Sequence, residues 1–203
     1  MIDTVVLDLG NVLVFWDPAG PFVGRLPDPE TTAFLTEFDF MAFNRLQDAG
    51  RSWADARADL AARAPEHLPA LDVYVEHFAD ALPGPVPGTL DLVRDLRACG
   101  IRLLGLTNWS AETFHLADPA APAIGLLEDV LVSGEVGVAK PDPRVFALLT
   151  ERFGVRPERA VFVDDSATNV AAGAAAGFDA VLFTTADALR ASLVARGVPL
   201  PRT

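Results

Sequence analysis

Five short runs of apolar and β-branched residues set the strongest limit on how this chain can fold. They lie at residues 4–9, 101–106, 129–133, 160–163 and 180–184. Each run is apolar nearly throughout, which is typical of strands covered on both faces. Helical patterns separate the later runs, at 88–98, 143–153, 169–176 and 186–196. This alternation predicts an α/β fold with a doubly wound, mainly parallel sheet and right-handed crossovers.

Residues 17–83 break this rhythm. They contain no convincing strand but carry helical patterns at 31–43, 53–63 and 71–81. The α/β pattern resumes after the turn-rich sequence PGPVPG at 83–88. We therefore expect a helical cap domain, residues 17–83, inserted into an α/β core of residues 1–16 and 84–203. Ligands bind at the carboxyl ends of strands in such sheets, so a cap inserted after the first strand is placed to act as a lid.

The charge and the cysteine content restrict the environment and the partners. The formal net charge is −12, and an acidic surface repels both nucleic-acid phosphates and anionic lipids, so neither is an expected partner. The single cysteine, Cys99, allows no intramolecular disulfide, which fits a reducing cytoplasm. The N-terminal stretch contains Asp3 and Asp8 and has no basic start, which argues against a signal peptide or a membrane span.

Polar side chains follow four of the predicted strands. They are Asp8 after the first, Thr107 and Asn108 after the second, Lys140 in the loop after the third, and Asp164, Asp165 and Ser166 after the fourth. In a parallel sheet all of them would meet at one edge. Three close carboxylates cannot all stay ionised without a cation, and Lys140 supplies one positive charge. A divalent metal such as Mg²⁺ together with a phosphoryl group fits this arrangement.

These motifs resemble those of the haloacid dehalogenase-like (HAD) hydrolase superfamily. The matching segments are DLGNVL at 8–13, LTN at 106–108, KP at 140–141 and VDDS at 163–166, in that superfamily's order. The helical insertion is similar to its small C1 cap. The DLGNVL, WDP and AKPDPRVF segments look most similar to its sugar-phosphate phosphatase-like branch, with the N-terminal phosphatase domains of epoxide hydrolases as another similar group.

The resemblance implies a Mg²⁺-dependent phosphatase acting on a small phosphorylated metabolite, such as a sugar phosphate. Asp8 would be the nucleophile that forms an aspartyl-phosphate, and Lys140 would neutralise charge on Asp8 and on the phosphate. Phosphate would be bound by Thr107, Asn108 and Lys140. The resemblance also implies a set of Mg²⁺ ligands, which would be Asp8, the backbone carbonyl of Gly10, Asp165 and, directly or through water, Asp164.

One position departs from the family pattern. Gly10 stands where the family's phosphatases usually carry a second Asp, which protonates the leaving oxygen and then activates water. A glycine keeps the backbone carbonyl for the metal but has no acid–base side chain. Loss of a general acid–base costs about 10²–10⁴-fold in rate. Asp17, at the hinge to the cap, is a candidate replacement.

Two functional alternatives stay open. A 2-haloacid dehalogenase also uses the first Asp and needs no general acid, but that class lacks the acidic pair that Asp164 and Asp165 form here. A catalytically degraded relative that only binds phosphate would also be compatible with Gly10. Trp16 and Trp109 are candidates either for lining the pocket or for packing under the cap, and the chain could be a monomer or a homodimer.

Overall fold

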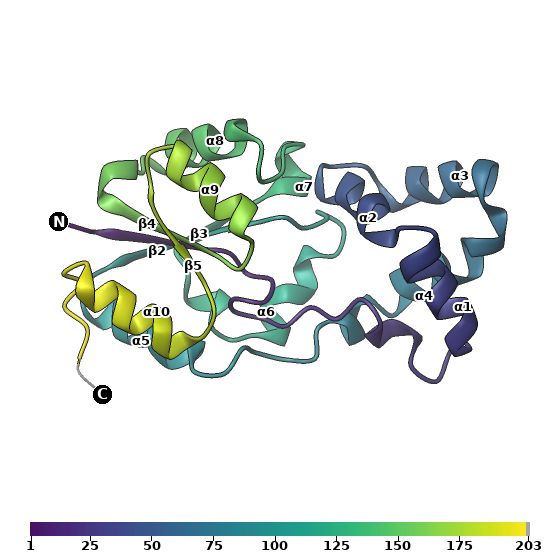
Figure 1. Cartoon of the computed structure of the whole chain (residues 1–203), viewed down its shortest axis with the longest axis horizontal. Helices are drawn as coiled ribbons and strands as arrows, with labels where there is room; N and C mark the ends of the chain where they lie inside the picture. Colours follow the sequence, from purple (N-terminus) through teal and green to yellow (C-terminus); the bar gives the residue numbers. More distant parts are fainter. Residues whose placement is uncertain (202–203) are drawn as a thin grey trace.

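A five-stranded parallel sheet organises residues 1–201, which are the residues that the computed structural model describes (Figure 1). The strands are β1 (Thr4–Leu7), β2 (Arg102–Thr107), β3 (Asp129–Val132), β4 (Ala160–Asp164) and β5 (Asp179–Leu182). Their order is β3-β2-β1-β4-β5. The chain therefore winds outward from β1 in one direction and then crosses over to β4, so the winding reverses between β1 and β4. The predicted doubly wound parallel sheet is confirmed.

Helices cover both faces of the sheet. Helices α5 (Thr89–Ala98) and α10 (Ala186–Ala195) lie on one face, and α8 (Pro143–Phe153) and α9 (Ala167–Ala175) lie on the other (Figure 1). Alternate residues of β1 point to opposite faces: Val5 and Leu7 belong to one apolar cluster, and Val6 belongs to the other. Because both faces are buried, the strand is apolar at every position, which is why its sequence shows no alternation.

The predicted strands are confirmed, with ends displaced by one or two residues. The helical pattern at 53–63 is α3 (Trp53–Arg63), and the pattern at 143–153 is α8. The single helix predicted at 31–43 is wrong. The structure has α1 (Asp28–Thr32), a π-helical turn (Ala33–Glu37) and then α2 (Phe40–Asp48). Between them Asp39 adopts a left-handed φ of 58°, and its side chain caps α2 by accepting a hydrogen bond from the Ala42 N–H.

The helix predicted at 71–81 is also divided, into α4 (Leu68–Glu76) and a 3₁₀ turn (Phe78–Ala81). In both cases the apolar periodicity continues through the point where the helix ends, because the backbone conformation there is not helical. The remaining short elements are α6 (Ala117–Ala120), α7 (Ser133–Val136) and 3₁₀ turns at Gly20–Phe22, Pro65–His67, Phe114–Leu116, Ile124–Leu126 and Pro157–Arg159. No helix within residues 1–201 has the length and apolar character needed to cross a bilayer.

The helical segment, residues 17–83, extends from one end of the sheet (Figure 1). Helices α1 to α4 enclose an aromatic core in which the ring of Phe34, fully buried, lies 5.9 Å from Phe22 and 5.2 Å from Phe40. The two connections to the sheet run side by side, because the Phe15 N–H donates to the Gly84 carbonyl at 2.9 Å. The helical segment therefore leaves and rejoins the α/β part at one place, at the carboxyl end of the strands.

Candidate active site

Asp8 lies directly beyond the last residue of β1, at the switch point of the sheet. Its N–H donates to the Val163 carbonyl at 2.8 Å, which continues the pairing of β1 with β4. Asp8 Oδ1 accepts a hydrogen bond from the Leu9 N–H at 2.7 Å. The same oxygen lies 2.9 Å from the Lys140 ammonium. Burial raises the pKa of the Asp8 carboxyl to about 7; Lys140 opposes this shift and Asp164 adds to it.

The turn after Asp8 is built by the motif that the sequence singled out. The Leu9 carbonyl accepts hydrogen bonds from the N–H groups of Val12, Leu13 and Val14. Asn11 has a left-handed φ of 55°, which Asn adopts more readily than most residues. A Cβ added to Gly10 would meet nothing within 4 Å. Packing therefore does not require a glycine at position 10, and a side chain could be accommodated there.

Asp164 and Asp165 come from the end of β4. Asp164 is fully buried and accepts hydrogen bonds from Lys140 Nζ at 2.7 Å, the Ser166 N–H at 2.9 Å and Asn169 Nδ2 at 3.0 Å. Asp165 is exposed and lines the pocket. Burial raises the pKa of Asp165, and the charge of Asp164 adds to this effect. Asp164 is thus held by protein donors, while Asp165 is the more accessible carboxylate of the pair.

Lys140 carries the positive charge of this cluster. Its side chain is fully buried and its Nζ contacts Asp8, Asp164 and, at 2.8 Å, the Leu106 carbonyl. Burial alone would lower the pKa of Lys140, but the two carboxylates outweigh it and the pKa is raised. The sequence also marks this position by its composition, because Lys140 is the only lysine among 16 basic residues and the others are Arg. An ammonium is a compact point charge, which suits a narrow gap between two carboxylates better than a guanidinium.

Asn108 holds the backbone of Lys140 with its side chain. Its Nδ2 donates to the Lys140 carbonyl, and its Oδ1 accepts from the Lys140 N–H, both at 2.8 Å. The side-chain amide is therefore used within the protein, and a contact of Asn108 with phosphate stays a prediction. Thr107, at the end of β2, is buried at the pocket wall.

Replacing Asn108 with Ala is expected to remove both hydrogen bonds that fix the Lys140 backbone. At about 0.5–1.5 kcal/mol for each bond, the free energy of unfolding should fall by about 1–3 kcal/mol. Urea denaturation measures this change. Asn108→Asp is the matched control, because it keeps the acceptor for the Lys140 N–H but sets a carboxylate oxygen against the Lys140 carbonyl, and it should not recover the lost stability. Full recovery of stability in Asn108→Asp would contradict the bracing role of the amide.

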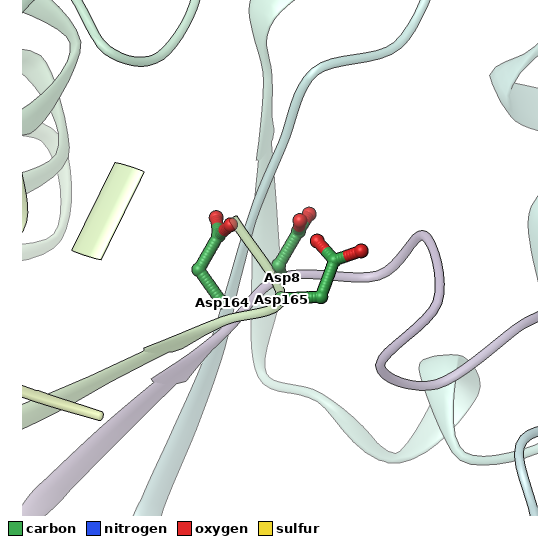
Figure 2. Close-up of side chains that lie close together, drawn as sticks. All are labelled: Asp8, Asp164 and Asp165. Atoms are coloured by element: carbon green, nitrogen blue, oxygen red, sulfur yellow. The ribbon is translucent and has the colours of Figure 1, made fainter. Parts of the chain in front are cut away.

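The three carboxylates form a group that fits a metal ion. Oxygen atoms of Asp8, Asp164 and Asp165 lie within 4.8 Å of one another, and the three side chains point the same way beyond the strand ends (Figure 2). Lys140 balances only part of this negative charge. Hard divalent cations take oxygen ligands of this kind. The donor set therefore fits such an ion, with Gly10 beside it at the pocket wall.

A pocket of about 250 Å³ opens over this cluster, between the sheet and the helical segment. The side facing the sheet is lined by Asp8, Gly10, Asn11, Trp16, Thr107, Asn108, Trp109, Ser110, Thr113 and Asp165. The side facing the helical segment is lined by Met41, Asn44, Arg45, Asp48, Trp53 and Phe78. Both tryptophans that the sequence left undecided, Trp16 and Trp109, thus line the pocket.

Sequence reasoning missed the lining residues of the helical segment, because they follow no transferable spacing. Asp48 and Trp53 are examples: neither belongs to a motif, and their place depends on how α2 and α3 pack on the α/β part. Asp17, proposed as a replacement acid, is exposed, accepts a hydrogen bond from the Ala19 N–H at 2.9 Å and is not among the pocket-lining residues of the described part of the chain.

With the fold and the site in view, comparison with known proteins defines the class. The model of the haloacid dehalogenase-like hydrolase family matches residues 2–177. The chain belongs to this family and is a hydrolase.

Similar proteins include enzymes that act on phosphate esters and on haloacids. The chain is 30% identical over 190 residues to a phosphoglycolate phosphatase of Caulobacter vibrioides, covering 88% of this chain and 78% of that protein. It is 33% identical over 111 residues to (S)-2-haloacid dehalogenase 1 of a Pseudomonas species, covering 55% of this chain and 46% of the dehalogenase. It is 28% identical over 204 residues to drimenol cyclase drtB of Aspergillus calidoustus, covering 95% of this chain but spanning only 36% of that protein's length.

Solved structures share the fold. A HAD-like family hydrolase from Porphyromonas gingivalis superposes with a TM-score of 0.75 at 22% identity, covering 97% of this chain and 98% of that one. A HAD family enzyme from Bacteroides thetaiotaomicron, in complex with magnesium and inorganic phosphate, superposes with a TM-score of 0.73 at 20% identity, covering 91% of this chain and 96% of that one.

Proposed function

We propose that this hydrolase is a Mg²⁺-dependent phosphatase that releases phosphate from a small phosphorylated metabolite through an aspartyl-phosphate on Asp8. One observation carries the proposal: Asp8, Asp164 and Asp165 lie within 4.8 Å of one another beside a pocket, and Lys140 contacts two of them. The phosphoglycolate phosphatases among its relatives, and the similar structure that holds magnesium and phosphate, support it.

In this proposal Asp8, Asp165 and the Gly10 carbonyl would hold the metal, with Asp164 close by. When bound, Mg²⁺ would neutralise and orient the phosphoryl oxygens. Asp164 would contribute by holding Lys140, since its two oxygens already accept from Lys140, Ser166 and Asn169.

The protein's own groups then act on the phosphoryl group. The Asp8 carboxylate attacks phosphorus, and the Leu9 N–H and Lys140 hold its Oδ1 in place for that attack. Lys140 and the Thr107 hydroxyl would stabilise the negative charge on the phosphoryl oxygens, because Lys140 contacts Asp8 and Thr107 ends the neighbouring strand β2. Water then cleaves the aspartyl-phosphate, which restores Asp8 and releases inorganic phosphate.

The helical segment serves in this proposal as the cap that selects the leaving group. We place the cap domain at residues 17–83 and the core at 1–16 and 84–203, as the sequence predicts. The hydrogen-bonded connections at Phe15 and Gly84 support these limits, and the six residues that the segment contributes to the pocket support the selective role. Water would be excluded when the segment covers the pocket.

Haloacid dehalogenation is the second candidate, favoured by the similarity to the Pseudomonas dehalogenase and by Gly10. Halide leaves without protonation, so that reaction needs no acid at position 10. The carboxylate cluster weighs against it, because attack on carbon gives Asp164 and Asp165 no metal-binding role.

A release assay with two substrate panels tests the proposal. Phosphomonoesters and 2-haloacids are incubated with the purified chain, with Mg²⁺ or with EDTA, and phosphate or halide is measured. We expect phosphate release that requires Mg²⁺ and no halide release. Halide release that persists in EDTA would overturn the phosphatase proposal in favour of a dehalogenase, and activity on neither panel would favour a phosphate-binding relative.

A further inference from the structure

The phosphatase proposal leaves one chemical task without a residue. An alkoxide leaving group needs a proton, and Gly10 has no side chain to supply it. Asp17 is exposed and tied to the backbone of Ala19, outside the pocket. Within residues 1–201, Asp48 is the one acidic residue besides Asp8 and Asp165 that lines the pocket.

Asp48 is the last residue of α2 and is fixed to the α/β part of the molecule. Its backbone carbonyl accepts a hydrogen bond from the Ser133 hydroxyl at 2.5 Å. The same Ser133 oxygen accepts from the Trp109 N–H at 3.0 Å, just beyond Thr107 at the end of β2. Two consecutive hydrogen bonds therefore connect Asp48 to the strand end that borders the nucleophile. Asp48 and Asp8 line the same pocket, Asp48 from the helical segment and Asp8 from the end of β1.

The surroundings of Asp48 suit a group that both gives and takes a proton. Burial raises the pKa of Asp48 to about 7, and the charges of Lys140 and Arg45 oppose the shift. Asn44, one turn earlier on α2, donates to Asp48 Oδ2 at 3.3 Å. Tyr74, on α4, lies near enough to interact with this carboxyl. Burial raises the pKa of the Tyr74 phenol, and the charge of Asp48 adds to the shift. An acid–base works best when its pKa lies near the working pH.

A second feature lies on the same side of the pocket as Asp48. Trp53 lines the wall and is only 5% exposed, yet its Nε1–H has no hydrogen-bond partner among residues 1–201. Buried donors without a partner are rare in folded proteins. Trp53 therefore adds an unsatisfied donor to the same wall of the pocket as Asp48. The ring of Trp53 lies 5.8 Å from that of Tyr74, and the charge of Asp48 contributes to the raised pKa of Tyr74.

We propose that Asp48 is the general acid–base of this active site and that it replaces the side chain missing at Gly10. The inference rests on the proposed phosphatase function. As Asp8 attacks phosphorus, the phosphorus–oxygen bond of the ester breaks and the leaving oxygen takes the proton of the Asp48 carboxyl. The resulting Asp48 carboxylate then accepts a proton from the water that attacks the aspartyl-phosphate. Alcohol and inorganic phosphate leave, and both carboxyl groups return to their starting state.

The test compares Asp48→Asn with wild type on two substrates, phosphoglycolate and 4-nitrophenyl phosphate, in Mg²⁺. The leaving group of phosphoglycolate needs a proton, so kcat/KM should fall by about 10²–10⁴-fold. Nitrophenolate leaves without one, so kcat/KM on 4-nitrophenyl phosphate should fall by less than about tenfold. For 4-nitrophenyl phosphate, kcat should fall more than kcat/KM, because the variant cannot activate the water that cleaves the aspartyl-phosphate. An initial burst of nitrophenolate should therefore precede slow turnover. Retained kcat/KM on this substrate also shows that the variant is folded.

Two further readouts separate catalysis from structure. In wild type, kcat/KM on phosphoglycolate should decline above about pH 7, where Asp48 loses its proton; this decline should be absent in Asp48→Asn. Gly10→Asp should restore at least about tenfold of the activity that Asp48→Asn loses, because position 10 has room for a side chain. Asp17→Asn is the matched control and should behave as wild type.

The outcomes distinguish this inference from the proposal beneath it. Wild type without Mg²⁺-dependent phosphate release overturns the phosphatase function and the assignment of Asp48 with it. Wild type that is active, with an Asp48→Asn variant that keeps the activity ratio between the two substrates, overturns only the assignment. A fall in kcat/KM that is equal for the two substrates also overturns the assignment of Asp48.

Discussion

Replacing Asp8 with Asn is expected to lower Mg²⁺-dependent phosphate release by about 10⁴-fold or more, because the variant has no carboxylate to attack phosphorus. Asn has nearly the same shape as Asp. Its side-chain oxygen can still accept the hydrogen bond that the Leu9 N–H donates to Asp8 in the unsubstituted protein, at 2.7 Å. The measurement is phosphate release at saturating substrate, for variant and wild type in parallel.

A binding measurement shows whether the Asp8→Asn site is still assembled. Calorimetric titration of the variant with inorganic phosphate in Mg²⁺ should still give saturable binding, since Lys140 and Thr107 are unchanged in the variant. Turnover within tenfold of wild type would show that Asp8 is not the nucleophile. Loss of turnover together with a collapsed unfolding transition would assign Asp8 a structural role instead.

Replacing Lys140 with Met is expected to give the largest change in stability. The substitution keeps the apolar stem but leaves Asp8 and Asp164 without the ammonium that lies 2.9 Å and 2.7 Å from them. Removing one partner of a buried ion pair costs about 3–5 kcal/mol of the free energy of unfolding. Urea denaturation in EDTA at pH 8, where no metal can compensate, measures this loss.

The loss caused by Lys140→Met should depend on pH in a definite direction. Without Lys140 the pKa of Asp8, already raised to about 7, rises further, because the group that opposed the shift is gone. A carboxyl with a raised pKa in the folded state stabilises the fold at low pH, and that contribution disappears as the pH rises through the folded-state value. The destabilisation should therefore be smaller at pH 5 than at pH 8. A loss that is equal at both values would mean that packing, not charge, explains it.

Lys140→Arg is the matched control, since it keeps the positive charge. The Lys140 side chain has no exposed surface and fits between Asp8 and Asp164. A planar guanidinium needs more room, so the Arg variant should fold better than Lys140→Met at pH 8 but bind phosphate more weakly than wild type. Wild-type behaviour of Lys140→Arg would show that position 140 needs only charge.

Much of the α/β part could be predicted because the same feature fixes both the sequence and the structure. A strand buried on two faces must be apolar at every position, so runs such as residues 160–163 indicate a strand of a parallel sheet. Polar residues that interrupt the pattern at the strand ends, such as Asp8 and Asp164, then meet because parallel strands end at the same edge. The helical segment was predicted less well, since the left-handed turn at Asp39 divides a continuous apolar periodicity.

By itself, the sequence determined the parallel sheet, the order of the motifs and the convergence of Asp8, Lys140, Asp164 and Asp165. The apolar pattern of each strand is local, and the helices between strands make neighbouring strands parallel. Only the tertiary structure decided what faces these residues across the pocket. Asp48 and Trp53 reach the wall because α2 and α3 pack against the end of the sheet, with Ser133 joining the Asp48 backbone to that of Trp109. Contacts of this kind join residues far apart in the chain, and no spacing in the sequence records them.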